Sequence, residues 1–276
     1  MQRIDAHQHF WQFDPVRDSW INEEMAVIQR DFLPPDLKPV LEANGFAGCV
    51  TVQSDSTEIE NEFQLNNARQ YPFIKGVVGW VDLQADNVED RLAYYQQFAQ
   101  MKGFRHVLQG EPQRDFMLRE TFRRGIGLLE KYNFTYDILI FPDQLPYARQ
   151  LVAEFPKQKF VVDHLAKPYI KKSRLTEWRN DIAALAQYEN VFCKISGMVT
   201  EADWQTWRPQ DFTPYVDAVV AAFSSSRIMY GSDWPVCLVA GSYAQVLDIV
   251  DQYFAKFFQT EQDNFFGGTA VKFYNL

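Results

Sequence analysis

The amino-acid sequence predicts a single (β/α)8 barrel, because short β-type runs alternate with helical patterns along the whole chain. The β-type runs recur about every 32 residues, which is the length of one strand–loop–helix unit. Apolar residues between these runs show helical spacing, and such alternation implies a parallel sheet. Eight units fit within the 276 residues, and eight is the number that closes this kind of barrel. We therefore expect residues 1–276 to form one α/β domain.

Each predicted strand is a run rich in β-branched or aromatic residues. The eight runs are RIDAHQ (3–8), FAGCVTVQ (46–53), FIKGVVGWV (73–81), GFRHVLQ (103–109), FTYDILIF (134–141), KFVVDHL (159–165), NVFCKIS (190–196) and RIMYGS (227–232). Helical patterns are clearest at residues 36–44, 120–132 and 242–258. Prolines are expected at segment edges, namely at Pro142, Pro156 and Pro214.

One segment, residues 10–33, falls outside the repeat and follows the first predicted strand. It carries four large aromatic residues, Trp11, Phe13, Trp20 and Phe32. Aromatic side chains bury large areas when they pack, so we expect this segment to form an ordered lid.

The composition excludes several classes of protein. The net charge is −9 and the sequence pI is about 5.0, whereas a nucleic-acid binder shows a basic patch or stripe. No apolar run approaches the roughly 18 residues of a membrane span, and no basic-then-apolar leader precedes Ile4. The three cysteines, Cys49, Cys193 and Cys237, are too few and too scattered for a disulfide framework. The expected location is therefore the reducing cytoplasm, and the oligomeric state stays open.

Polar residues gather where the predicted strands end, and this end of a barrel carries the active site in enzymes of this fold. All four histidines lie at or near the exits of three strands: His7 and His9 at the first, His106 at the fourth and His164 at the sixth. Asp233 follows the eighth strand. Such clustering favours a functional site over surface histidines.

The first strand carries a His-x-His pattern. Side chains alternate along a strand, so His7 and His9 are expected on one face, with Asp5 one step deeper on the same face. Two imidazoles on one face can hold one ion or one carbonyl, and the alternative is a pair of hydrogen-bonded core histidines. His164 and Asp233 each emerge directly after a buried run, and the alternative role for each is to cap the next segment. Together, these four residues favour a catalytic site.

Two basic residues are predicted to point into the barrel. Phe104 is expected to face the helices, and His106, two residues later, shares its face of the strand. Arg105 lies between them and would therefore face inward. Lys194 interrupts an apolar strand, which is costly unless the lysine is paired or functional. Lys194 would join Arg105 in making the site positive, or it would form an ion pair with Asp163 or another barrel carboxylate.

Six segments together resemble the amidohydrolase superfamily: AHQHFW, GFRHVLQGEP, VVDHLAKP, KISG, GSDWPV and GGTAVKFYNL. They are most similar to the amidohydrolase-2 branch that contains sugar lactonases of the L-fuconolactone and L-rhamnonolactone hydrolase type. The resemblance covers nearly the whole chain. HQHFW, DHLAKP and SDWP are quite specific in combination, although each alone is weak. The resemblance implies a TIM barrel of the metal-dependent hydrolase type.

The resemblance also implies a metal site formed by His7, His9, His164 and Asp233. The fifth strand carries Asp137 where metal-binding members often supply a histidine, so a two-metal centre is not expected. One divalent cation, with zinc as the first choice, is the expected cofactor. A metal-free site, in which the histidines hydrogen-bond the substrate carbonyl directly, stays open as the alternative.

The activity that the resemblance implies is hydrolysis of a small-molecule sugar lactone to the sugar acid. Asp233 would act as the general base toward water and then return the proton to the leaving ring oxygen, with His164 as a second catalytic residue. The substrate-binding residues would be Trp11, Trp80, Arg105 and Lys194. One alternative is a decarboxylase of an aromatic or related acid, and the missing fifth-strand histidine favours the lactonase. Another is a non-catalytic barrel that binds a sugar acid, and the intact histidines argue against it.

Overall fold

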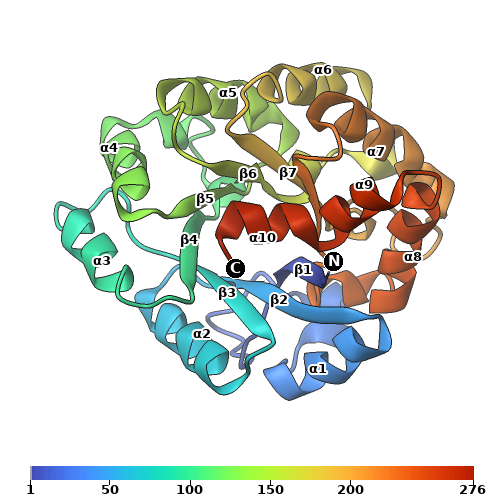
Figure 1. Cartoon of the computed structure of the whole chain (residues 1–276), viewed down its shortest axis with the longest axis horizontal. Helices are drawn as coiled ribbons and strands as arrows, with labels where there is room; N and C mark the ends of the chain where they lie inside the picture. Colours follow the sequence, from blue (N-terminus) through green and yellow to red (C-terminus); the bar gives the residue numbers. More distant parts are fainter. Residues whose placement is uncertain (1) are drawn as a thin grey trace.

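Eight parallel strands form one sheet in the computed structural model, which describes residues 2–276. Their order in the sheet is their order in the chain, and the sheet curls into a nearly closed barrel (Figure 1). The strands are β1 (Arg3–Gln8), β2 (Phe46–Val52), β3 (Ile74–Gly79), β4 (Met101–His106), β5 (Thr135–Ile138), β6 (Phe160–Val162), β7 (Val191–Ile195) and β8 (Ile228–Tyr230). All eight predicted strands are present, so the (β/α)8 prediction is confirmed.

Helices surround the strands (Figure 1). They are α1 (Pro34–Ala43), α2 (Glu58–Gln70), α3 (Val88–Tyr95), α4 (Glu120–Leu129), α5 (Leu145–Glu154), α6 (Thr176–Leu185), α7 (Pro209–Phe223), α8 (Tyr243–Phe254), α9 (Gln259–Asp263) and α10 (Thr269–Tyr274). The prediction for Pro214 is wrong, because this proline lies inside α7. Pro214 is the sixth residue of this helix, so the helix lacks the backbone N–H that would otherwise bond the carbonyl four residues earlier.

The C-terminal helix α10 lies across one end of the barrel in Figure 1, with both chain termini beside it. Its Phe273 and Tyr274 pack in one apolar cluster with barrel residues that include Val50 and Val161. The backbone carbonyl of Phe273 accepts a hydrogen bond from Lys159, just before β6 begins. Helix α10 therefore closes the amino end of the barrel and leaves the carboxyl end for a site.

Strand β1 contains a bulge that breaks the expected alternation of its side chains. Asp5 pairs with Cys49 in β2 and Gln8 pairs with Thr51, so β1 has one extra residue between these two pairs. A bulge changes the direction in which the following side chains point. Ala6 packs in the apolar cluster inside the barrel, whereas the Asp5 carboxylate bonds Tyr243 of the outer helix α8. The expectation that Asp5 shares the face of the histidines is therefore wrong.

Residues 10–33 are folded against the barrel, as expected for an ordered lid. Trp11 and Phe32 form an antiparallel bridge, and their rings meet edge to face with centroids 5.6 Å apart. Phe32 also packs edge to face on Trp234, which follows β8. Both ends of the segment are thereby anchored at the carboxyl end of the barrel. Within residues 2–276, no helix has the length and apolar character that crossing a bilayer requires.

Candidate active site

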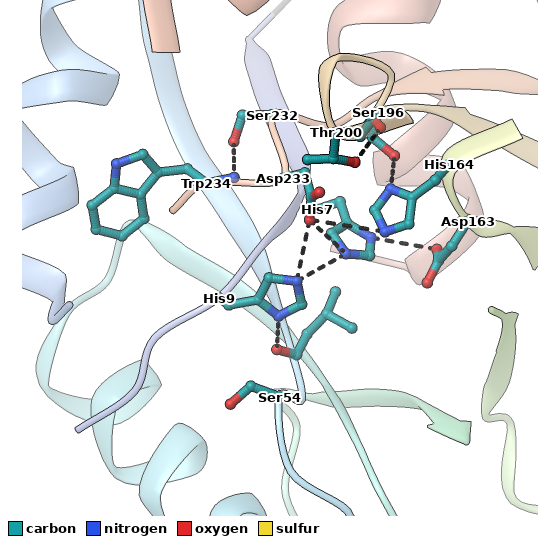
Figure 2. A network of polar contacts seen from close by, with 12 residues as sticks. His7, His9, Ser54, Asp163, His164, Ser196, Thr200, Ser232, Asp233 and Trp234 are labelled. Carbon is teal, nitrogen blue, oxygen red and sulfur yellow. Dashed lines mark hydrogen bonds and ion pairs between the residues drawn. The ribbon is translucent and has the colours of Figure 1, made fainter. Parts of the chain in front are cut away.

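Three imidazoles surround the carboxylate of Asp233 at the carboxyl end of the barrel (Figure 2). Asp233 Oδ1 lies 3.4 Å from His9 Nε2, 3.7 Å from His7 Nε2 and 3.8 Å from His164 Nε2. The two first-strand rings also meet, with 3.2 Å between their Nε2 atoms. All four side chains are buried. The structure thus brings together the four residues that the sequence placed at three separate strand exits.

Backbone and side-chain partners orient two of the imidazoles. His9 Nδ1 lies 2.8 Å from the carbonyl oxygen of Val52 in β2. A carbonyl oxygen can only accept, so Nδ1 carries the proton and, in the neutral ring, Nε2 presents a lone pair toward Asp233. His164 Nδ1 lies 2.8 Å from Ser196 Oγ, just after β7. Both hydrogen bonds leave Nε2 free to face the cluster.

The segment after β6 turns in a left-handed sense and carries His164 into the site. Four successive residues, His164 to Lys167, have φ values of 53°, 56°, 56° and 49°. Non-glycine residues in this conformation are strained, and such strain is concentrated at functional sites. Strict alternation would place Asp163 and His164 on opposite faces. Because the turn begins at His164, both side chains reach the inside of the barrel, and Asp163 Oδ1 lies 3.3 Å from His7 Nδ1.

Gly197 packs directly on the site from the loop after β7. Its φ is +57°, and a Cβ at this position would lie 2.6 Å from His164 Nδ1 and 3.1 Å from Asp233 Oδ2. Thr200 Oγ1 holds this loop by donating to the Gly197 carbonyl over 2.8 Å. The backbone itself therefore forms one wall of the site.

Lys194 lies inside the barrel and contacts His7. Its Nζ is 2.5 Å from Asp137 Oδ2, 3.0 Å from Asp163 Oδ1 and 3.1 Å from His7 Nδ1. The side chains of Lys194 and both aspartates are fully buried. Tyr274 of α10 donates its hydroxyl to Asp137 over 2.8 Å. Of the two roles expected for Lys194, the structure shows the ion pair with Asp163, extended by Asp137.

Arg105 points into the barrel, as predicted. Its NH1 lies 3.0 Å from Asp163 Oδ2 and 3.4 Å from His7 Nε2, and Gln53 accepts its remaining hydrogen bonds. His106 faces the other way and stacks on Phe116, with ring centroids 5.2 Å apart. Arg105 thus places a positive charge beside His7, and the fourth histidine belongs to a different cluster.

Burial and charge set the ionisation of the site. Burial lowers the pKa of His7 well below its usual value, although the Asp163 charge opposes this effect. Burial also lowers the pKa of His164 to about 4, against the opposing charge of Asp233. For Asp233 itself, burial would raise the pKa, but the imidazoles, His164 foremost, outweigh burial and hold it below the usual range. At neutral pH, both imidazoles are neutral and Asp233 is ionised.

The pKa values of the two deeper carboxylates, Asp137 and Asp163, are shifted in opposite directions. Burial raises the pKa of Asp137 to about 6, against the opposing charge of Lys194. Burial would also raise the pKa of Asp163, but Lys194, His7 and Arg105 outweigh it and hold this pKa well below its usual value. The negative charge between the two cations therefore resides first on Asp163.

The two tryptophans proposed as substrate walls have different surroundings. Trp11 is buried, donates from Nε1 to the Arg30 carbonyl and lies with its ring centroid 6.4 Å from that of His9. Trp80 is partly exposed and donates from Nε1 to His106 Nδ1 over 3.2 Å. The structure therefore places Trp80 against His106 and Trp11 against the three-histidine cluster. This cluster consists of Asp233 and its three imidazole neighbours, His7, His9 and His164.

The cluster fits a divalent metal ion. Ligand atoms of His7, His164 and Asp233 all lie within 4.8 Å of one another, and all three residues are buried. Neutral imidazoles and an ionised carboxylate are the protonation states that metal binding requires, and this N and O donor set suits zinc. Asp137 lies deeper and is paired with Lys194, so it does not take the place of a fifth-strand histidine in the cluster.

Sequence reasoning assigned no role to Asp5, Ser196 or Gly197, and it named Asp163 only as one ion-pair partner open to Lys194; all four residues support the cluster from behind. Asp163 and Ser196 stand at predicted strand ends, so their positions were a usable signal. The close approach of Gly197 and the partners of Asp5 depend on loop geometry and on the bulge, and no short pattern in the sequence reports either.

Known proteins that resemble this chain include some that share only its fold and some that are also similar in sequence. A solved 2,6-dihydroxybenzoate decarboxylase has a TM-score of 0.69 at 13% identity, covering 100% of this chain and 99% of that chain, which shows a shared fold alone. A curated L-fucono-1,5-lactonase from Burkholderia multivorans is 37% identical over 99% of this chain and 96% of its own length. A solved amidohydrolase from Burkholderia multivorans with bound zinc has a TM-score of 0.97 at 36% identity, covering 100% of both chains.

The family model described as amidohydrolase matches residues 4–276. This match spans β1 to α10 and includes every residue of the three-histidine cluster. With the buried His7, His9, His164 and Asp233 gathered at the carboxyl end of the barrel, the chain belongs to the amidohydrolase family.

Proposed function

We propose that this protein hydrolyses a sugar lactone to the corresponding sugar acid. The observation that carries the proposal is an ionised, buried carboxylate, Asp233, within 3.8 Å of three imidazole Nε2 atoms. Lactone opening needs a base for water, polarisation of the carbonyl and a proton for the departing oxygen. The lactonase relative at 37% identity supports this reaction class.

Asp233 serves as the base in the proposed reaction. It removes a proton from water as the water oxygen bonds to the lactone carbonyl carbon. The bond from that carbon to the ring oxygen then breaks, and the protonated Asp233 transfers its proton to the departing ring oxygen. The product is the open hydroxy acid, which loses its carboxylic proton to the solvent at neutral pH.

The imidazoles hold a divalent cation in this proposal rather than the carbonyl itself. The proton that His9 holds on Nδ1 faces Val52, so in the neutral ring Nε2 accepts or ligates and does not donate to a carbonyl oxygen. His7, His9, His164 and Asp233 would hold the ion, which when bound polarises the carbonyl as a Lewis acid. Arg105, beside His7, adds positive charge where the oxyanion develops.

A panel of aldono-1,4- and aldono-1,5-lactones tests the proposed function. The purified protein should acidify a weakly buffered solution of at least one lactone well above the spontaneous rate, with a pH indicator as the readout. Aromatic carboxylic acids in the same panel test the decarboxylase alternative through carbon dioxide release. No proton release from any lactone would remove the lactonase proposal.

Metal content tests the cofactor proposal separately. Protein purified without chelator should contain about one divalent ion per chain, because the four residues supply one set of ligands. Prolonged chelation should remove the ion and the lactonase activity together, and zinc should restore both. A metal-to-protein ratio near zero in active enzyme would exclude the zinc scheme and leave the reaction class intact.

A further inference from the structure

The sheet closes between β1 and β8, where the catalytic residues of both strands also lie. His9 N donates to the Trp234 carbonyl over 2.7 Å, and Asp233 N donates to the His7 carbonyl over 2.8 Å. The bridge between Gln8 and Trp234 is isolated, whereas each of the other strand pairs forms a ladder of at least three partners. We propose that Asp5 is a positioning residue that closes this seam and sets the distance between His7 and Asp233.

The Asp5 carboxylate takes the place of the missing ladder. The bulge in β1 disrupts the local pairing, and Asp5 Oδ1 accepts the His7 N–H over 3.1 Å. The same oxygen accepts the Ser232 N–H of the β8 exit over 2.9 Å. One oxygen atom thereby joins the backbones of the two strands at His7 itself and at Ser232, the residue before Asp233.

Helix α8 fixes the other carboxylate oxygen. Tyr243, the first residue of α8, donates its hydroxyl to Asp5 Oδ2 over 3.1 Å. Both Asp5 and Tyr243 are buried, and solvent therefore does not compete for these hydrogen bonds. The carboxylate is held at three points, namely the backbone N–H of His7, the backbone N–H of Ser232 and the hydroxyl of Tyr243.

The seam has no spare space. A Cβ added to Gly231, next to Ser232, would lie 2.6 Å from His7 Cβ. The two strands therefore touch at His7. We call the hydrogen bonds that the Asp5 carboxylate accepts the clamp. Because no gap can absorb a movement, losing these bonds shifts His7 relative to Asp233. Misplacement of a catalytic group by about 1 Å can cost about 100-fold in rate.

Three variants test the clamp, and the test rests on the proposed function for one of its two readouts. Asp5→Ala removes every acceptor, Asp5→Asn keeps one carbonyl oxygen for the two backbone N–H groups, and Tyr243→Phe removes one donor. The matched control is Gln158→Met, because Gln158 is also buried and bonds the Phe134 carbonyl near the amino end of the barrel. The readouts are kcat and KM on the best lactone, and zinc affinity by competition with a fluorescent chelator.

The expected order of effects follows from the number of hydrogen bonds to residue 5 that remain. Asp5→Ala should lower kcat and zinc affinity by about 10- to 100-fold, with KM nearly unchanged because Asp5 does not touch substrate. Tyr243→Phe should lower kcat and zinc affinity by roughly 3- to 10-fold. Asp5→Asn should retain most of the kcat and zinc affinity that Asp5→Ala loses. Gln158→Met should lower the melting temperature and leave both readouts unchanged.

Two outcomes would overturn the proposal. The first is a folded Asp5→Ala protein whose kcat and zinc affinity match those of Gln158→Met. If Asp5→Ala does not fold, wild-type values in Tyr243→Phe overturn it. A wild-type protein that opens no lactone contradicts the proposed function instead, and the zinc affinities of the variants then still test the role of Asp5. If the wild type binds no zinc, the kcat values of the same variants test that role.

Discussion

Single hydrogen bonds determine which nitrogen of His9 and of His164 faces Asp233. The Val52 carbonyl fixes the proton of His9 on Nδ1, and Ser196 Oγ lies against Nδ1 of His164. Outer partners of this kind orient a ligand ring and tune its basicity. The chemistry of the site therefore depends on two atoms, Val52 O and Ser196 Oγ, that contact the imidazoles at Nδ1, away from Asp233.

Ser196→Ala should lower kcat and metal affinity by about 10- to 100-fold. The substitution removes the partner of His164 Nδ1 and leaves the ring free to rotate away from Asp233. The measurement is steady-state hydrolysis of the best lactone together with zinc affinity. Gln158→Met is the control, because Gln158 is buried and bonds the Phe134 carbonyl near the amino end of the barrel, away from the imidazoles. Equal kinetics in the two variants would contradict the role of Ser196.

At the scale of elements, the loops after β6, β7 and β8 create the site as much as the strands do. The left-handed turn after β6 brings in His164, and the loop after β7 lays the Gly197 backbone on it. Asp233, after β8, also has a positive φ of 58°. Each of these strands ends at the carboxyl end of the barrel, next to a polar residue. The backbone conformation of the following loop then sets the direction of that side chain.

Gly197→Ala should lower kcat by at least about 10-fold, since its Cβ would displace His164 or Asp233 from their present positions. Gly45→Ala is a matched control, because Gly45 has a similar φ of +74° with nothing within 4 Å of the added Cβ. Both variants carry the backbone cost of an alanine at positive φ. Lactonase kinetics and melting temperatures separate the two effects. Equal loss of kcat in both variants would show that backbone strain alone is responsible.

How well the sequence predicts an element depends on how far apart in the chain the residues that shape it lie. Buried parallel strands produce continuous apolar runs, so all eight were visible in the sequence, as was the inward phase of Arg105. Alternation failed at Asp5 and at His164, because a bulge and a left-handed turn interrupt it. Both irregularities depend on partners far away in the chain, such as Tyr243 for Asp5.

At the scale of the whole molecule, a buried charge network connects the closed end of the barrel with the site. Tyr274 of α10 bonds Asp137, Asp137 pairs with Lys194, and Lys194 contacts both Asp163 and His7. Two aspartates balance Lys194 and Arg105 in the barrel interior. Sequence reasoning identified Lys194 as costly unless paired, but the partner Tyr274 was not predicted, because it lies beyond the eight repeats.

Lys194→Met should destabilise the protein by about 3–5 kcal/mol, because it leaves buried carboxylates without their cation. Tyr274→Phe, which removes one neutral donor to Asp137, should cost about 1 kcal/mol. Chemical denaturation gives both free energies of unfolding. A Lys194→Met protein no less stable than Tyr274→Phe would show that the network is not needed to compensate the aspartates.

The substitution Asp233→Asn tests most directly whether the three-histidine cluster opens lactones through Asp233. It keeps the size of the side chain and removes the base. On the lactone that the wild type opens fastest, kcat should fall at least about 100-fold, with the circular dichroism spectrum and melting temperature retained. Asp82→Asn, at an exposed carboxylate after the third strand, should keep wild-type kinetics. Near-normal turnover by a folded Asp233→Asn protein would contradict the account, because the base would then be another group.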